Sequence, residues 1–250
     1  MIPARFDYEV AESVEHALEL LGAGDAKLLA GGHSLIPALK LRIARPERLV
    51  DIGRLTDLAY VRDAGTQIAI GALTRHQAVG SAPLLQEHCP IVSRTAAQIG
   101  DPQVRHRGTI GGSLAHGDPA SEFFTGVFET AVGPGEMLTE IRVPKLGDRG
   151  SAYNKARRRA QDWATVGVAA IVRRANGGFE SASIALVSMG ATPLRATSAE
   201  NALLGGASVA DAAALLADGT EPPSDHAGSS AYRAHLVTVI GRRALEEALA

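Results

Sequence analysis

Cysteine is almost absent from this chain of 250 residues, which contains only Cys89. An iron–sulfur cluster needs several thiolate ligands, and a structural zinc site usually needs several Cys or His ligands at short spacing. The 8 histidines form neither a His-x-His nor a His-Glu-x-x-His pair. The sequence therefore predicts that this chain alone holds no iron–sulfur cluster and no metal.

The chain also has little net charge and no long apolar segment. A net charge of −2 and a pI of about 6.4 give no electrostatic case for nucleic-acid binding. The longest apolar run, Trp163 to Val172, is too short to span a bilayer. Residues 1–10 carry charged and polar side chains where a signal peptide has an apolar core. We therefore expect no transmembrane segment and a cytoplasmic location, with peripheral membrane association through a larger complex left open.

Three common motifs are missing as well. Neither the phosphate-binding loop Gly-x-x-x-x-Gly-Lys-Ser/Thr nor the nucleophile elbow Gly-x-Ser-x-Gly occurs. The segment 22–27 begins like Gly-x-Gly-x-x-Gly, but it ends in lysine and leads from a predicted helix into a predicted strand. That order is the reverse of the dinucleotide-binding fingerprint, so we expect no Rossmann site.

Hydrophobic residues make up 46% of the chain, which suits a core-forming protein of one to three domains. The N-terminal pattern predicts a small α/β unit. Ser13 is a candidate N-cap for an amphipathic helix that Gly22 and Gly24 close. A hairpin and helices follow before residue 109. The expected elements are strands at 6–10, 27–30 and 48–52, a helix at 35–41, a hairpin over 58–71, and helices near 75–80 and 91–99.

A linker at 147–150 introduces the C-terminal third. Strand-like segments at 151–157, 164–174 and 179–188 are punctuated by a turn signal, Asn176-Gly177-Gly178. The alanine-rich remainder predicts helices, with Ser208 and Ser230 as candidate caps. The last helix has an apolar stripe at helical spacing, formed by Tyr232, Leu236, Val239, Ile240, Ala244 and Ala248.

The most informative positive feature is a pair of glycine-rich segments. The first glycine motif is Ala-Gly-Gly-His-Ser at 30–34, and the second is Thr-Ile-Gly-Gly-Ser-Leu-Ala-His-Gly-Asp-Pro at 109–119. Each joins two glycines to a hydroxyl side chain, so the backbone can approach an anion with no Cβ in the way. The first motif also precedes a predicted helix, whose N-terminal amides favour negative charge. Two such loops suit a diphosphate.

Four segments, in chain order, resemble a known family. They are AGGHSLIP at 30–37, TIGGSLAHGDPAS at 109–121, EMLTEIRVP at 136–144, and Tyr-Asn-Lys with Asp-Trp-Ala-Thr-Val-Gly within 153–167. Together they resemble the FAD-binding medium subunit of molybdenum hydroxylases, in particular the aerobic carbon monoxide dehydrogenase type and its xanthine dehydrogenase relatives. The resemblance covers nearly the whole chain.

The resemblance implies an extended FAD whose diphosphate lies on both glycine motifs. By position, it assigns Leu138 and Ile99 to apolar lining, Tyr153 to one ring face, and Lys155 to a cation near the flavin. Such a cation would stabilise the anionic reduced ring. The alternative is that Lys155 faces water as one of the basic residues at 155–159. The remaining cofactor-binding positions are Ala30, Gly31, Gly32, His33, Ser34, Leu35, Thr109, Ile110, Gly111, Gly112, Ser113, Asp118 and Glu122.

One departure from the family lies at Glu122, where the family prefers Asp. In the family, several tens of residues separate this region from anything like Phe123-Phe124-Thr125-Gly126, whereas here Glu122 runs directly into Phe123. Two explanations stay open: a natural deletion, or residues missing from the sequence because they were not ordered.

The sequence thus predicts an α+β flavoprotein with a two-part FAD-binding domain over 1–146, divided into 1–53 and 54–146. A C-terminal domain of antiparallel sheet plus three helices follows over 147–250. The resemblance implies electron transfer from an iron–sulfur small subunit through FAD to an external acceptor, beside a molybdenum-cofactor large subunit, in a dimer of heterotrimers. No residue of this chain is expected to act as acid, base or nucleophile. The alternatives are a stand-alone FAD oxidoreductase and a structural subunit that has lost flavin.

Overall fold

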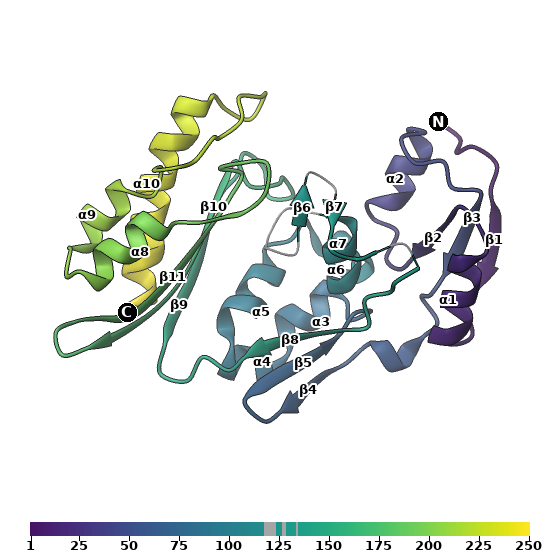
Figure 1. Cartoon of the computed structure of the whole chain (residues 1–250), viewed down its shortest axis with the longest axis horizontal. Coiled ribbons are helices and arrows are strands. Elements are labelled where there is room, and N and C mark those ends of the chain that lie inside the picture. Colours follow the sequence, from purple (N-terminus) through teal and green to yellow (C-terminus); the bar gives the residue numbers. More distant parts are fainter. Residues whose placement is uncertain (118–123, 127–128, 134) are drawn as a thin grey trace.

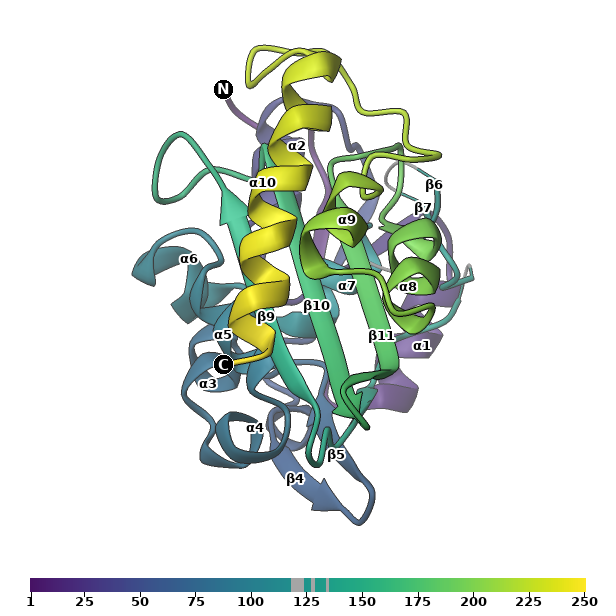
Figure 2. The same ribbon diagram turned by 90° about the vertical axis from the view of Figure 1, so that its left-hand side faces the viewer.

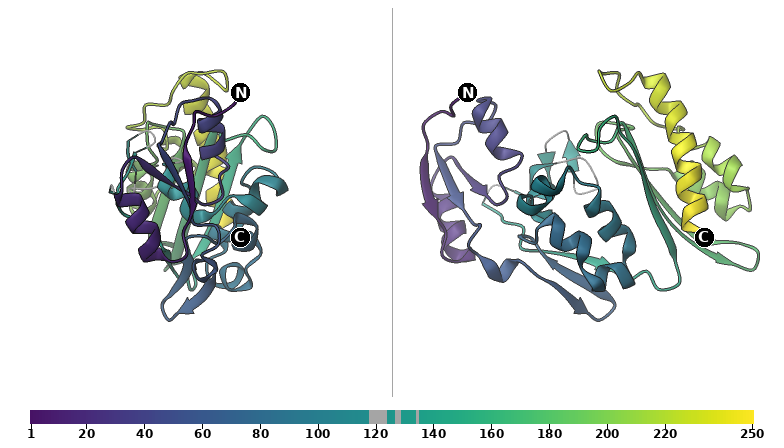
Figure 3. Two further views of the ribbon diagram at one scale, coloured as in Figure 1. Left: turned by 90° about the vertical axis from the view of Figure 1, so that its right-hand side faces the viewer. Right: turned by 180° about the vertical axis from the view of Figure 1, so that it is seen from behind.

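A computed structural model describes residues 1–117, 124–126, 129–133 and 135–250. The chain forms three units that follow one another in space as they do in sequence (Figure 1). Seen from behind, the N-terminal unit and the C-terminal helices lie at opposite ends, with the middle unit between them (Figure 3). The predicted α+β fold is confirmed.

The N-terminal unit is a small parallel sheet with order β1-β3-β2. Its first helix begins where the sequence predicts, because the Ser13 side chain accepts a hydrogen bond from the amide of His16. Ala17 and Val50 lie in the core between helix and sheet. The elements are β1 (Asp7–Val10), α1 (Val14–Gly22), β2 (Ala26–Leu29), α2 (Leu35–Lys40) and β3 (Arg48–Asp51).

The middle unit joins an antiparallel sheet to a group of short helices. The strand order is β4-β5-β8, and Ile68 and Ile70 of the central strand are fully buried against the helices. The elements are η1 (Thr56–Leu58), β4 (Val61–Ala64), β5 (Gln67–Gly71), α3 (His76–Ser81), α4 (Pro83–His88), α5 (Pro90–Ala97), α6 (Pro102–Arg107), α7 (Ile110–His116), β6 (Phe124–Gly126), β7 (Glu129–Thr130) and β8 (Glu140–Pro144).

The C-terminal unit is an antiparallel sheet of order β12-β11-β10-β9 with helices on its outer face (Figure 2). Alternation along β10 explains how the sheet joins two cores: Val168 and Ala170 face the C-terminal helices, whereas Ala169 and Ile171 pack against the middle unit. The elements are β9 (Gly150–Ala156), β10 (Val166–Ala175), β11 (Gly178–Val187), β12 (Leu194–Arg195), α8 (Thr197–Leu204), α9 (Val209–Ala214) and α10 (Ser230–Ala248).

Most predicted elements are found, and the Asn176-Gly177 turn joins β10 to β11 with φ of 51° and 80°, as a tight hairpin requires. Two details of the last helix are wrong. Ser229 rather than Ser230 caps α10, through a bond from the amide of Tyr232. The Tyr232 side chain is 51% exposed, because the buried face is rotated toward Val237, Gly241 and Leu245.

Two helices, α4 and α6, do not appear in the sequence-based prediction. The second glycine motif, expected to be a loop, is largely helix α7. In the part of the chain that the structure describes, no helix combines the length and the apolar character needed to cross a bilayer.

Candidate functional site

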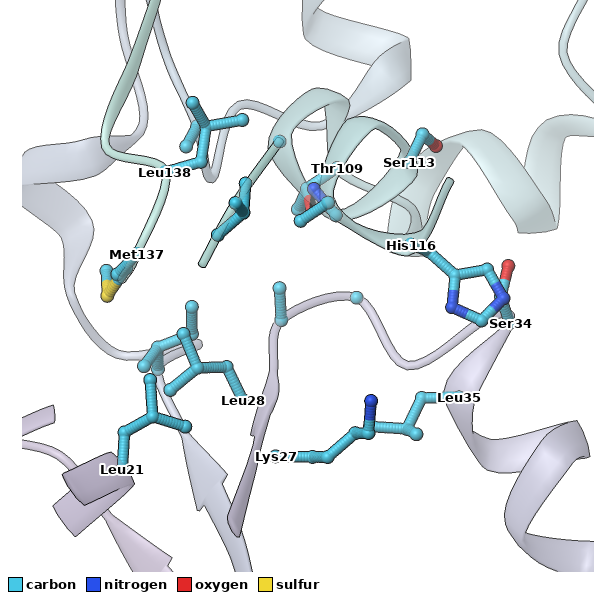
Figure 4. Close-up of a pocket in the computed structure, with 18 of the residues that line it drawn as sticks. Leu21, Lys27, Leu28, Ser34, Leu35, Thr109, Ser113, His116, Met137 and Leu138 are labelled. Carbon is cyan, nitrogen blue, oxygen red and sulfur yellow. Dashed lines mark hydrogen bonds between the residues drawn. The ribbon is translucent and has the colours of Figure 1, made fainter. Parts of the chain in front are cut away.

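A pocket of about 580 Å³ lies between the N-terminal unit and the middle unit. Its walls are the start of β2, the first glycine motif, the first turns of α7, and the segment that precedes β8 (Figure 4). Its lining combines apolar side chains, among them Leu21, Leu28 and Met137, with hydroxyl groups and a lysine. This is the mixture expected of a pocket for an organic molecule that carries charged groups.

The first glycine motif offers free backbone donors to this pocket. Gly32 has a φ of 75°, a left-handed conformation that favours glycine. Among the described residues, the amides of positions 31–34 have no hydrogen-bond acceptor. Consecutive free amides in a turn form a concave site for an anion, as the sequence predicts.

The backbone amides at the start of the second glycine motif have acceptors within the protein. Thr109 caps α7, and its side chain accepts a bond of 3.1 Å from the amide of Gly112. The amide of Gly111 donates to Ala72 O at 2.9 Å, and that of Ser113 to Thr109 O at 3.0 Å. Helix formation and capping therefore engage these amides within the protein. The contact of this motif with a diphosphate stays a prediction.

A glycine of each motif packs closely against another backbone segment of the middle unit. A Cβ placed on Gly31 would lie 2.3 Å from Arg107 O and 2.9 Å from the Cα of Gly108. A Cβ on Gly111 would lie 2.5 Å from the Cβ of Ala72 and 2.7 Å from its carbonyl oxygen. All four distances are far below van der Waals contact. Glycine is thus needed at positions 31 and 111 so that the two walls of the pocket can pack against protein backbone.

The structure places most of the predicted cofactor positions in this pocket and leaves others outside it. Asp118 and Glu122 lie outside the described residues. Ile99, Ile110, Tyr153 and Lys155 are not among the lining residues. The predicted positions that line the pocket are Ala30, Gly31, Gly32, His33, Ser34, Leu35, Thr109, Gly111, Gly112, Ser113 and Leu138.

Lys155 and Tyr153 instead lie on β9, beside α5. The ammonium of Lys155 donates to Gln98 O at 3.4 Å, and burial, with the nearby charge of Arg157, lowers its pKa. Tyr153 packs in the core shared by the middle unit and the sheet, and burial raises its pKa. Lys155 is therefore not a freely solvated member of the basic run.

Sequence reasoning missed many of the lining residues, among them Lys27, His116 and Met137. Lys27 is on β2, three positions before Ala30, and no described residue forms an ion pair or hydrogen bond with its ammonium. The available signal was a lysine in an otherwise apolar strand that enters a glycine turn. An unpaired cation beside free amides fits a phosphate group.

The fold and this pocket define a class of protein: a nucleotide-cofactor-binding unit joined to a sheet-and-helix domain. Comparison with known proteins identifies the family. The "FAD binding domain in molybdopterin dehydrogenase" matches residues 4–124, and the "CO dehydrogenase flavoprotein C-terminal domain" matches 151–248. The chain belongs to the FAD-binding medium subunits of molybdenum hydroxylases, of the carbon monoxide dehydrogenase type, and FAD is the cofactor of this family.

Individual relatives match over their full length. The carbon monoxide dehydrogenase medium chain of Hydrogenophaga pseudoflava is 38% identical, with 100% of this chain and 99% of the relative covered. The glyceraldehyde dehydrogenase medium chain of Sulfolobus acidocaldarius is 36% identical over 99% of each. The structure of carbon monoxide dehydrogenase from Hydrogenophaga pseudoflava lacking the Mo-pyranopterin moiety matches with a TM-score of 0.94 and 40% identity, covering 100% and 99% of the two chains.

The alignment with the Hydrogenophaga relative also reveals a difference in length. It spans 284 positions, against 250 residues here, so that 34 positions of the alignment have no residue in this chain. The sequence predicts such a gap between Glu122 and Phe123, which lie outside the described residues.

Proposed function

We propose that the pocket between the glycine motifs binds FAD and that this chain relays electrons. Reducing equivalents enter from iron–sulfur centres on a partner chain and leave to an external acceptor. The observation that carries the proposal is the convergence of both glycine motifs, with Lys27, on one pocket. FAD, when bound, supplies the redox chemistry.

The residues of this chain have binding and positioning roles. The free amides of the first glycine motif and the ammonium of Lys27 would bind the diphosphate. Helix α7 would close the opposite wall with the hydroxyl of Ser113, and Leu138 would supply apolar contact. None of these residues needs to transfer a proton. The roles of Ile99, Ile110, Tyr153, Asp118 and Glu122 toward FAD, and the domain boundaries at 53 and 146, stay predictions.

The partners follow from what the chain lacks. One cysteine cannot hold the iron–sulfur relay that such an electron path requires. We propose an iron–sulfur small subunit and a molybdenum-cofactor large subunit, assembled as a dimer of heterotrimers in the cytoplasm. Because relatives carry names as different as carbon monoxide dehydrogenase, glyceraldehyde dehydrogenase and nicotine 6-hydroxylase, the substrate would be chosen by the large subunit rather than by this chain.

Purification from the native organism tests the proposal. We expect the chain to co-purify with one iron–sulfur chain and one molybdenum chain, with one FAD for each copy of this chain. Native mass spectrometry and flavin absorbance measure both quantities. A colourless protein would indicate a structural subunit that has lost flavin, and a yellow monomer that oxidises a substrate without partners would indicate a stand-alone enzyme. Either result contradicts the proposed relay.

A second test concerns Lys155. If its ammonium stabilises the anionic reduced flavin, Lys155→Met lowers the flavin midpoint potential by tens of millivolts and slows flavin reduction. The scale follows because about 30 mV corresponds to roughly 1.4 kcal/mol for a two-electron couple. Potentiometry on samples of measured FAD content is the readout, with the exposed Lys40→Met as the matched control. A fully loaded Lys155→Met protein with the parent's potential would contradict a flavin contact.

A further inference from the structure

His76 is a buried polar residue directly behind the pocket. It is the first residue of α3, and only 3% of its surface is exposed. Its amide donates to Gly108 O at 3.0 Å, which joins α3 to the residue before Thr109. Its ring nitrogen Nε2 lies 3.0 Å from Oγ of Ser113, a residue that lines the pocket.

The imidazole of His76 is neutral, so it acts through its hydrogen bond and its packing rather than through a charge. Burial lowers the pKa of its imidazole to about 4, so that the ring is neutral at physiological pH. A neutral imidazole has one donor and one acceptor nitrogen, and a serine hydroxyl can donate or accept. The bond with Ser113 therefore forms with either tautomer, and it fixes the direction of the hydroxyl group.

His76 also supports the opposite wall. A Cβ on Gly108 would lie 2.8 Å from Cδ2 of His76, which shows that the ring lies directly against Gly108. Gly108 in turn lies against Gly31 of the first glycine motif. A Cβ on Gly31 would be only 2.9 Å from the Cα of Gly108. One imidazole thus touches α7 through Ser113 and reaches the first glycine motif through Gly108.

We propose that His76 is a positioning residue for FAD: it sets the spacing of the two pocket walls and the orientation of the Ser113 hydroxyl. The inference rests on the proposed function, since it assumes that FAD occupies this pocket. It predicts that the hydrogen bond at Nε2, and not only the volume of the ring, contributes to FAD affinity.

A matched pair of substitutions separates the effect of the hydrogen bond between His76 and Ser113 from the effect of the ring's volume. The amide group of glutamine can occupy the position of Nε2, whereas the shorter asparagine cannot reach Ser113. We expect His76→Gln to keep FAD affinity close to that of the parent, and His76→Asn to weaken it about five- to tenfold, the scale of one net hydrogen bond. His235→Gln, an exposed site on α10, is the control for the chemical change. Affinity is measured by titrating FAD into flavin-free full-length protein, beside the melting temperature of each sample.

A double-mutant cycle with Ser113→Ala completes the test. If the two side chains act as one unit, Ser113→Ala weakens FAD binding in the parent but adds little in the His76→Asn background. Independent, multiplying effects would overturn the proposal, as would equal affinities for the Gln and Asn variants. If His76→Asn does not fold, His76→Phe, which fills the space without a hydrogen bond, takes its place. A parent protein that binds no FAD refutes the proposed function itself, and this inference with it; a parent that binds FAD while His76→Asn binds equally well refutes only the role of His76.

Discussion

Replacing Gly111 with valine is expected to yield protein without FAD and with a lower melting temperature. The added Cβ would lie 2.5 Å from the Cβ of Ala72 and 2.9 Å from its Cα, at the point where the amide of Gly111 donates to Ala72 O. Neither group can move without displacing α7 from β5. Overpacking of this kind costs about 1–3 kcal/mol and shifts backbone, so the wall of the pocket moves as well.

Gly31→Val, in the opposite wall of the pocket, is also expected to lose FAD and to lower the melting temperature, because its Cβ would lie 2.3 Å from Arg107 O. Gly22→Val is the matched control, since no atom lies within 4 Å of a Cβ at this position and its φ is not in the left-handed region. FAD content per mole of folded protein, beside circular dichroism and the melting temperature, decides the outcome. Folded Gly31→Val or Gly111→Val protein with full FAD occupancy would contradict the arrangement of the two motifs.

These glycines show what the sequence could predict and what it could not. Their presence in pairs is visible in the sequence, and it correctly points to a site that both segments share. The reason for glycine at positions 31 and 111 is not visible, because it depends on contacts with Arg107 and Ala72 made only in the fold. The glycine pattern indicates that positions 31 and 111 have no room for a side chain, but it does not identify the neighbouring residues that fill the space.

The fold was predictable wherever a local signal was strong. The Ser13 cap and the Asn176-Gly177 turn each determine an element through interactions between near neighbours in sequence. Helices α4 and α6 have six residues each, too few for a periodic pattern, although both begin with proline. Tertiary packing rather than propensity determines such short helices.

In the candidate site, too, local features were predictable from the sequence, whereas features that depend on the fold were not. The first glycine motif is a local turn, and the sequence identifies its free amides. The positions of Tyr153 and Lys155 came from a family resemblance, and the structure puts both on β9, outside the pocket lining. Lys27 was missed because a single lysine in a strand has many ordinary explanations, and only the fold shows that it lines the pocket.

Lys27→Met is expected to reduce FAD affinity by one to two orders of magnitude while the protein remains folded. Lys27 lines the same pocket as residues 31–34, whose amides are free, and its ammonium has no partner among the described residues (Figure 4). A hydrogen bond to a charged group contributes about 1.5–3 kcal/mol, which corresponds to roughly a ten- to hundredfold change in the dissociation constant. Methionine keeps the length and apolar stem of the side chain, so the loss is that of the charge.

The dependence on salt distinguishes this contact from a general loss of packing. If Lys27 pairs with the diphosphate, the affinity of the parent protein falls as ionic strength rises, and the affinity of Lys27→Met falls less steeply. Lys40→Met, at an exposed position on α2 outside the pocket, should keep both the affinity and the salt dependence of the parent. FAD titrations of the three proteins at low and high salt measure these quantities. Equal affinities and equal slopes for the parent and Lys27→Met would place the diphosphate away from Lys27, and the first glycine motif would then have to bind it without a cation from β2.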